Sequence, residues 1–196
     1  CDSDWSSDVC SSDLVLLWGF NEGLHQNIRD NFQSTVIGSL QVHHEGFFRE
    51  PALERHIPRP GEVTRHLEAL GVAQWTLRLE SFALAAGERH AEGALVFGVD
   101  PARESRVTDL ARKVTRGRFL EPGDERRCVL GAGTAAALGV AVGDPLVVVY
   151  QDRFGITAAE ELEVTGIITS GEMGIDRGMV IIPLAQAQYL LEMGAG

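Results

Sequence analysis

Apolar side chains recur at a helical spacing in several segments of this chain. In the first segment an apolar residue returns every four positions, at Phe20, Leu24, Ile28 and Phe32, and Gly38 follows. This spacing places the apolar residues on one face, so we predict an amphipathic helix that ends before Gly38. The same reasoning predicts further helices over residues 62–70, 105–116, 131–138 and 183–191.

Other segments alternate apolar and polar residues, or are continuously apolar, and these patterns are typical of strands. In 39–48, Leu40 and Val42 alternate with Gln41 and His43. Further strands are predicted over 72–84, 91–99, 128–130, 145–150, 162–168 and 179–182. The segment AAGERH, between the strands predicted at 72–84 and 91–99, predicts a hairpin. Strands outnumber helices and the two are mixed in order, so the predicted fold class is α+β.

The first fourteen residues, CDSDWSSDVCSSDL, follow neither period and do not resemble a signal or transit peptide. The codons of a common sequencing-library adapter translate as DWSSDVCSSDL, which matches residues 4–14. We therefore interpret residues 1–14 as translated adapter, with a natural tail rich in Ser and Asp as the alternative. The genuine sequence then begins near Val15.

Residues 15–20, VLLWGF, have the composition of a membrane helix at the interface. They are too few to cross a bilayer, which takes roughly 20 residues. Periodicity alone favours a soluble surface helix for the segment that follows, over a continuation of a membrane helix.

Charge and cysteine content exclude two classes of partner. The net charge is −11, and the Lys and Arg residues form no cluster, which argues against nucleic acid. The three cysteines show no CxxC and no metal-ligand spacing. Cys128 stands at the start of an apolar run, so we predict a buried structural thiol.

Candidate chemistry is weak throughout the chain. The stretch GAGTAAALG at 131–139 resembles a phosphate-binding turn, but Ala136 stands where a dinucleotide fingerprint needs Gly, and a Walker loop would need Lys-Ser or Lys-Thr. Tight packing between a strand and a helix explains these glycines better. His43 and His44 are neighbours on a predicted strand, so they point to opposite faces and cannot easily share a metal. We predict no catalytic, cofactor or metal site, and no enzyme.

From Val129 onward the motifs become specific. VLGAGTAAALGVAVGDPLVVV is similar to the pattern of MacB/FtsX-type ABC transporter permeases, and LEVTGIITSG and MVIIPLAQAQYLL follow in that family's order. Upstream, FGVDPARES and the segment from WGFNEGLHQNI to GSLQVH also resemble the family. The resemblance covers residues 15–194 and is closest to lipoprotein-release permeases.

The resemblance implies a MacB-type periplasmic domain, made of a porter-like α/β half and an inserted β-rich subdomain, on a helical stalk from the first membrane helix. Residues 15–37 become the end of that membrane helix and the stalk. Residues 38–104 become the first part of the porter-like half. Residues 105–196 become the inserted subdomain, with the rest of the porter half beyond this sequence. The stripe Phe20, Leu24, Ile28 and Phe32 becomes the stalk and dimer interface.

The resemblance also implies a function. The protein is expected to be the membrane subunit of an ABC transporter in the bacterial inner membrane, with this domain on the periplasmic side. It would couple cytoplasmic ATP hydrolysis to extracytoplasmic movements, which is called mechanotransmission. The implied partners are a cytoplasmic ABC ATPase subunit, a second permease copy or paralogue, a periplasmic or outer-membrane partner, and lipid or lipoprotein cargo.

Three functions stay open at this point. The first is lipoprotein release. The second is export or envelope signalling, as in MacB-like and FtsX-like permeases. The third, from another class, is a free-standing soluble binding module.

The loop that begins at Gln151 is the candidate for recognition. It contains Gln151, Asp152, Arg153, Phe154 and Gly155 and joins two apolar strands. In lipoprotein-release permeases the equivalent loop can extend into a hook that engages a periplasmic carrier, but this loop is short and has no Pro-rich extension. We predict that residues 151–159 contact cargo or a partner protein, with an Asp152–Arg153 pair within the loop. The alternative is that Phe154 folds back onto the domain.

Overall fold

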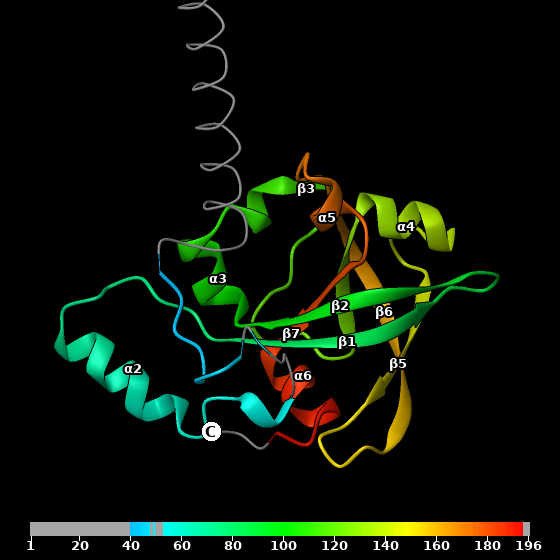
Figure 1. Cartoon of the computed structure of the whole chain (residues 1–196). Coiled ribbons are helices and arrows are strands. Elements are labelled where there is room, and N and C mark those ends of the chain that lie inside the picture. Colours follow the sequence, from blue (N-terminus) through cyan, green and yellow to red (C-terminus); the bar gives the residue numbers. More distant parts are fainter. Residues whose placement is uncertain (1–39, 48, 50–52, 194–196) are drawn as a thin grey trace, which may run out of the picture. The chain divides into compact units, whose positions relative to one another are not determined.

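A computed structural model describes residues 40–47, 49 and 53–193 (Figure 1). The predicted stalk stripe of Phe20, Leu24, Ile28 and Phe32 and the interpreted adapter at 1–14 lie outside the described residues. The chain divides into two compact units, Cys1–Leu40 and Gln41–Gly196, and all the described elements belong to the second. No helix in the described part is long and apolar enough to span a bilayer.

The described strands form one sheet that closes on itself. The strand order is β3-β6-β4-β7-β2-β1-β5, and β5 also pairs with β6 (Figure 1). Two neighbouring pairs, β2 with β7 and β4 with β6, are parallel, and the others are antiparallel. The strands are β1 (Arg78–Ala86), β2 (Ala91–Val99), β3 (Val114–Gly117), β4 (Arg127–Gly131), β5 (Pro145–Gln151), β6 (Thr157–Ile168) and β7 (Met179–Pro183).

Short helices connect the strands, and local sequence explains where they start and stop. The Asp100 carboxylate accepts hydrogen bonds from the N–H groups of Ala102 and Arg103, at 3.0 and 3.2 Å, which caps the helix that starts at Pro101. Gly139 ends another helix in the left-handed region, at φ 68°. The helices are η2 (Leu53–Arg55), α2 (Pro60–Ala69), α3 (Pro101–Val107), η3 (Leu110–Lys113), α4 (Ala132–Leu138), α5 (Met173–Asp176) and α6 (Leu184–Leu190).

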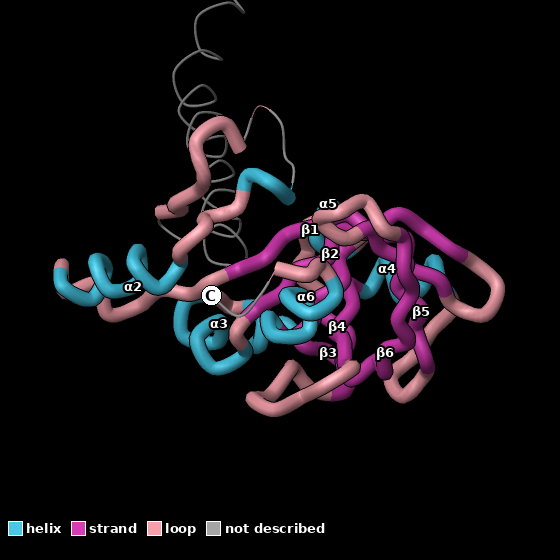
Figure 2. Tube along the Cα trace, turned by 90° about the horizontal axis from the view of Figure 1, so that it is seen from below, coloured by secondary structure: helices cyan, strands magenta, loops and turns pink. Residues whose placement is uncertain are grey.

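The hydrophobic core lies inside the closed sheet. Its strand residues are almost fully buried, and each Val, Leu or Ile among them contributes on the order of 1.5–3 kcal/mol. Helix α6 packs against β1, β2 and β7, and in Figure 2 it lies in front of the strands. The core cluster includes Ala85, Ala94, Val96, Leu130, Leu146, Val148, Leu162, Val164, Val180, Ile182, Leu190 and Leu191.

A second set of buried residues lies on the outer face of the same sheet. Phe97, Val99 and Ile181 are next to core residues in sequence, so their side chains point outward. They are nevertheless at most 4% exposed. The segment after α3 supplies the buried side chains of Leu110 and Phe119. The segment after α3 packs against β6, which pairs in the sheet with β3, the strand that follows η3, and with β4.

Most predicted elements are confirmed, among them the helices at 62–70 and 131–138 and the hairpin between β1 and β2, where Ala86 pairs with Ala91. The predicted strand 39–48 is wrong in its described part, because residues 40–44 pair with no strand and 45–47 form a turn. The predicted helix 105–116 is also wrong. The Asp100 cap and Pro101 start the helix earlier, and residues 114–117 pair with β6 instead.

The described elements make a mixed domain of helices and strands, as predicted. The closed sheet takes β1 and β2 from before residue 104 and β4 to β7 from after it. The division of the chain there into a porter-like part and an inserted part stays a prediction.

Candidate functional site

The predicted recognition loop joins β5 and β6 as a short, ordered turn. Gln151 pairs with Thr157 at the end of the two strands. The Asp152 carboxylate accepts hydrogen bonds from the backbone N–H groups of Phe154 and Ile156, at 2.8 and 2.9 Å. The Gln151 side-chain amide donates to the Gly155 carbonyl at 2.9 Å. These side-chain bonds hold the backbone of the loop in one shape.

Gly155 permits this turn because its φ is 81°, a region that residues with a side chain rarely adopt. The backbone N–H of Asp152 also donates to the Ile156 carbonyl at 3.0 Å. The loop is therefore held by both backbone and side chains.

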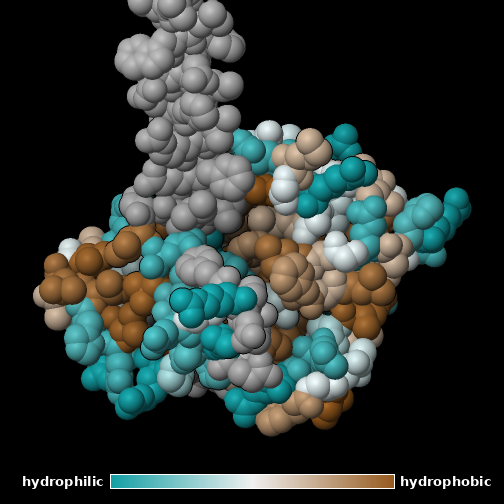
Figure 3. All heavy atoms as spheres, in the orientation of Figure 1, coloured by the Kyte–Doolittle hydropathy of each residue, from teal (hydrophilic) through white to brown (hydrophobic). Residues whose placement is uncertain are grey.

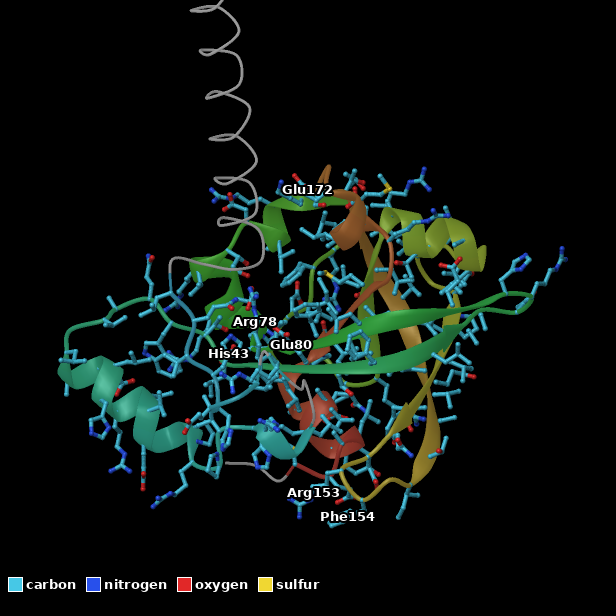
Figure 4. The ribbon with its side chains drawn as sticks, in the orientation of Figure 1. His43, Arg78, Glu80, Arg153, Phe154 and Glu172 are labelled. Atoms are coloured by element: carbon cyan, nitrogen blue, oxygen red, sulfur yellow. The ribbon has the colours of Figure 1, made fainter. Side chains whose placement is uncertain are left out.

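Phe154 and Ile156 extend from this loop into solvent. Phe154 is 65% exposed and Ile156 is 61% exposed. Figure 4 shows Arg153 and Phe154 at the outer end of the hairpin that β5 and β6 form. Phe154 does not fold back onto the domain, so the alternative raised by the sequence does not hold. Ile156 adds a second exposed apolar side chain to the loop, and sequence inspection did not single it out.

The predicted pair between Asp152 and Arg153 is replaced by two other contacts. No ion pair joins them in the described part of the chain, because Asp152 is used by the loop backbone. The Arg153 guanidinium lies 4.6 Å from the centre of the Phe154 ring. This cation–π contact places a positive charge beside the exposed ring.

The base of the loop rests on the core. The backbone N–H of Arg153 donates to the Leu191 carbonyl at 3.5 Å, which links the loop to the end of α6. Burial raises the pKa of Tyr150, and the nearby carboxylate of Glu160 raises it further. The phenol therefore stays neutral at physiological pH, and the loop sits on an apolar support.

The other sequence candidates have structural roles. A side chain on Gly131 would come within 2.5 Å of the Asp176 carbonyl, so this glycine lets β4 and α4 pack closely against α5. Cys128 is fully buried, and that burial raises the pKa of its thiol far above the ordinary value. Within the described residues, no cluster of His, Cys, Asp and Glu could hold a metal ion.

Sequence inspection missed a buried ion pair between β1 and α3. Glu104 is fully buried, and its carboxylate accepts hydrogen bonds from the Arg78 guanidinium and from the Thr108 hydroxyl, the latter at 2.7 Å. Thr76 also donates to it, at 3.3 Å. A Glu four residues into a short helix gives no local sign of burial, so only the fold reveals this pair.

Comparison with known proteins identifies the family. The model of the MacB-like periplasmic core domain matches residues 14–195. The chain is 33% identical over 122 residues to the lipoprotein-releasing system transmembrane protein LolC of Xylella fastidiosa strain Temecula1. The aligned residues cover 59% of this chain and 29% of that protein. LolC of Neisseria meningitidis serogroup B is 28% identical over 119 residues, which cover 57% of this chain and 28% of that protein.

A solved structure supports the fold. The extracellular domain of the noncanonical ABC-type transporter YknZ from Gram-positive bacteria matches with a TM-score of 0.51 at 14% identity, and covers 66% of this chain and 64% of that chain. The chain spans less than a third of the length of the LolC relatives. The family match extends over nearly the whole sequence, in agreement with the motifs around Gly131. The chain belongs to the family of MacB-like periplasmic core domains.

Proposed function

We propose that this chain is the extracytoplasmic domain of an ABC transporter permease of the LolC/MacB type in the bacterial inner membrane. The observation that carries the proposal is the family match over residues 14–195, together with 33% identity to a LolC protein. The permease couples ATP hydrolysis by a cytoplasmic ABC ATPase subunit to movement of this domain. Lipoprotein release is the favoured process, because the similar curated relatives bear that name.

The assembly has two further contacts under this proposal. A second permease copy or a paralogue meets the stripe of Phe20, Leu24, Ile28 and Phe32, which carries motion from the membrane. The loop with Phe154 and Ile156 meets lipoprotein cargo or a periplasmic or outer-membrane partner. The order of the loop supports this role, because a fixed apolar tip loses little conformational freedom on binding.

The decisive experiment reconstitutes the complete permease. Its full reading frame, co-expressed with the neighbouring ABC ATPase, is placed in proteoliposomes that hold a radiolabelled lipoprotein. We expect release of the lipoprotein that depends on ATP, and a loss of release in Phe154→Ala with unchanged basal ATPase activity. Arg65→Ala, an exposed change on α2, is the matched control and should release normally.

Two results would contradict the proposal. ATP hydrolysis without lipoprotein release would favour export or envelope signalling. A reading frame without an apolar run of about 20 residues before Phe20 would favour a free-standing binding module.

A further inference from the structure

No described residue covers the outer face of the closed sheet over β1 and β5, where Phe82 and Leu84 are exposed. Pairing across the strands places Leu84 beside Gly93 and Val149, and Ala86 beside Ala91 and Val147. Phe82 pairs with Leu95 in the next row on the same face. We name this surface the open face, and it consists of Phe82, Leu84, Ala86, Leu95, Val147 and Val149.

The open face is apolar and accessible. Phe82 is 72% exposed and Leu84 is 45% exposed. Elsewhere on the same outer face, Phe97 and Ile181 are at most 4% exposed. Figure 3 shows apolar side chains gathered over the middle of β1 and over β5. Small neighbours such as Gly93 and Ala159 leave this surface flat, and a contiguous apolar surface of this kind marks an interaction site.

Carboxylates border the open face. Glu161 of β6 pairs with Val147 of β5, so its side chain lies on the same face of the sheet as Val147. Glu80 lies two residues before Phe82 in β1, so its side chain also lies on the outer face. Neither Glu80 nor Glu161 has an ion-pair partner in the part of the chain that the structure describes. Glu163 follows on the same edge and is 3.9 Å from the Arg127 guanidinium. A ligand for this face is therefore expected to carry cations at its margin.

The strands leave no backbone groups for a ligand beneath the part of the open face that consists of Leu84, Ala86, Val147 and Val149. Residues 83–86 of β1 lie between β2 and β5, and residues 147–150 of β5 lie between β1 and β6. An extended peptide laid across them would leave its own N–H and C=O groups without partners, whereas a helix satisfies these groups internally.

We propose that the open face binds an amphipathic helix of a partner protein, with an apolar stripe flanked by Lys or Arg. The stripe packs on Phe82, Leu84 and Val149, and the flanking cations meet Glu80 and Glu161. This proposal concerns a surface distinct from the β5–β6 loop, and it does not rest on the proposed function.

The test uses two synthetic helical peptides of about eighteen residues, five turns each. Both carry the same Leu and Ala stripe, and one has Lys flanks where the other has Glu. Each is titrated into the full 196-residue chain, with fluorescence anisotropy for affinity and NMR shifts for location. We expect the Lys peptide to shift residues of β1 and β5 and to bind at least tenfold more tightly than the Glu peptide. Its affinity should fall as salt is added.

Variants of the chain locate the site. Leu84→Asp should weaken binding of the Lys peptide at least tenfold. Glu161→Lys should weaken it about three- to tenfold and strengthen binding of the Glu peptide. Met173→Asp, a change at a 77% exposed apolar residue in α5, is the matched control and should bind normally. If Leu84→Asp does not fold, the exposed Glu161→Lys still decides.

Three results would overturn the proposal. Equal affinity for the two peptides would show that Glu80 and Glu161 do not contribute to binding. Shifts confined to other elements would place the site elsewhere. A dimer of the chain that Leu84→Asp dissociates in sedimentation would assign the open face to a second copy.

Discussion

Single residues show how this domain manages charge inside a small fold. The Glu104 carboxylate is fully buried, yet three side chains donate hydrogen bonds to it, from Thr76, Arg78 and Thr108. A buried charge is tolerated only when it is satisfied in this way. This ion pair joins β1 to α3, and the sequence patterns that predict these elements do not indicate a contact between them.

Glu104→Gln should therefore be strongly destabilising. The substitution removes the negative charge from a buried site that still holds the Arg78 guanidinium, so we expect a loss of about 3–5 kcal/mol in the free energy of unfolding. Urea denaturation measures it. Glu62→Gln breaks the exposed pair with Arg59 and should change stability by less than about 1 kcal/mol. Equal losses of stability for the two substitutions would show that the Glu104 carboxylate does not form a buried ion pair with Arg78.

A second residue-scale prediction concerns pH. The guanidinium of Arg118 donates to the Asp124 carboxylate at 2.7 and 2.8 Å, and this hydrogen bonding lowers the pKa of Asp124, with help from the Glu121 N–H. A lowered pKa contributes stability that is present above the ordinary Asp value of about 3.9 and is lost as pH falls through the native value.

Asp124→Asn should then cost about 1–2 kcal/mol at pH 7, since Arg118 is partly exposed. The gap in unfolding free energy between the native chain and the variant should narrow below about pH 4. Chemical denaturation at a series of pH values measures it. A gap that stays constant from pH 7 to pH 3 would contradict the assigned pair.

At the scale of elements, the loop between β5 and β6 is the clearest example of order without burial. Its side chains at Phe154 and Ile156 are exposed, while Asp152 fixes its backbone. Separate substitutions in this loop can therefore test the order of its backbone and the stability of the whole domain.

Phe154→Ala should leave the domain nearly as stable as before, within about 0.5 kcal/mol, because the ring is mostly in solvent. Phe97→Ala, at a residue only 4% exposed, is the matched comparison and should cost about 3–5 kcal/mol. Thermal midpoints of the two variants measure the difference. A large drop in midpoint for Phe154→Ala would place that ring in the core.

Asp152→Ala should loosen the loop without unfolding the domain. The backbone N–H groups of Phe154 and Ile156 lose their acceptor, so their hydrogen exchange should accelerate at least tenfold, while exchange in β5 and β6 stays unchanged. NMR-detected exchange measures each amide separately. Unchanged exchange at both amides would show that the Asp152 carboxylate does not hold the loop.

Sequence patterns predicted the elements whose signals are local. The Gly131 and Gly139 spacing predicts α4, the PLVVVY run predicts β5, and the segment AAGERH predicts the hairpin of β1 and β2. The loop predicted over residues 151–159 was placed correctly at its start, but β6 already begins at Thr157, so the loop is shorter than predicted. What sequence missed depends on partners far along the chain. The strand after Lys113 exists because β6 is beside it, and residues 40–44 find no such neighbour.

At the scale of the whole molecule, closure of the sheet ties the two parts of the chain together. β1 lies between β2 and β5, so a strand from before residue 104 pairs directly with one from after it. Val96 of β2 and Leu162 of β6 belong to the same core cluster. No local pattern in the sequence specifies the pairing of β1 with β5, because three strands and three helices lie between these two segments.

The shared core predicts that residues from both sides of position 104 unfold together. If either part unfolded, the core residues of the other part would be exposed to water. Calorimetry of the chain should therefore show one main cooperative transition. Val96→Ala and Leu162→Ala remove buried methyl groups on opposite sides of the boundary. Both should lower the midpoint of that same transition, and Leu162→Ala should cost about 2–5 kcal/mol. If each variant instead lowered a different transition, the two parts would be independent folding units, and the subdomain boundary of the family would also be a boundary of stability in this chain.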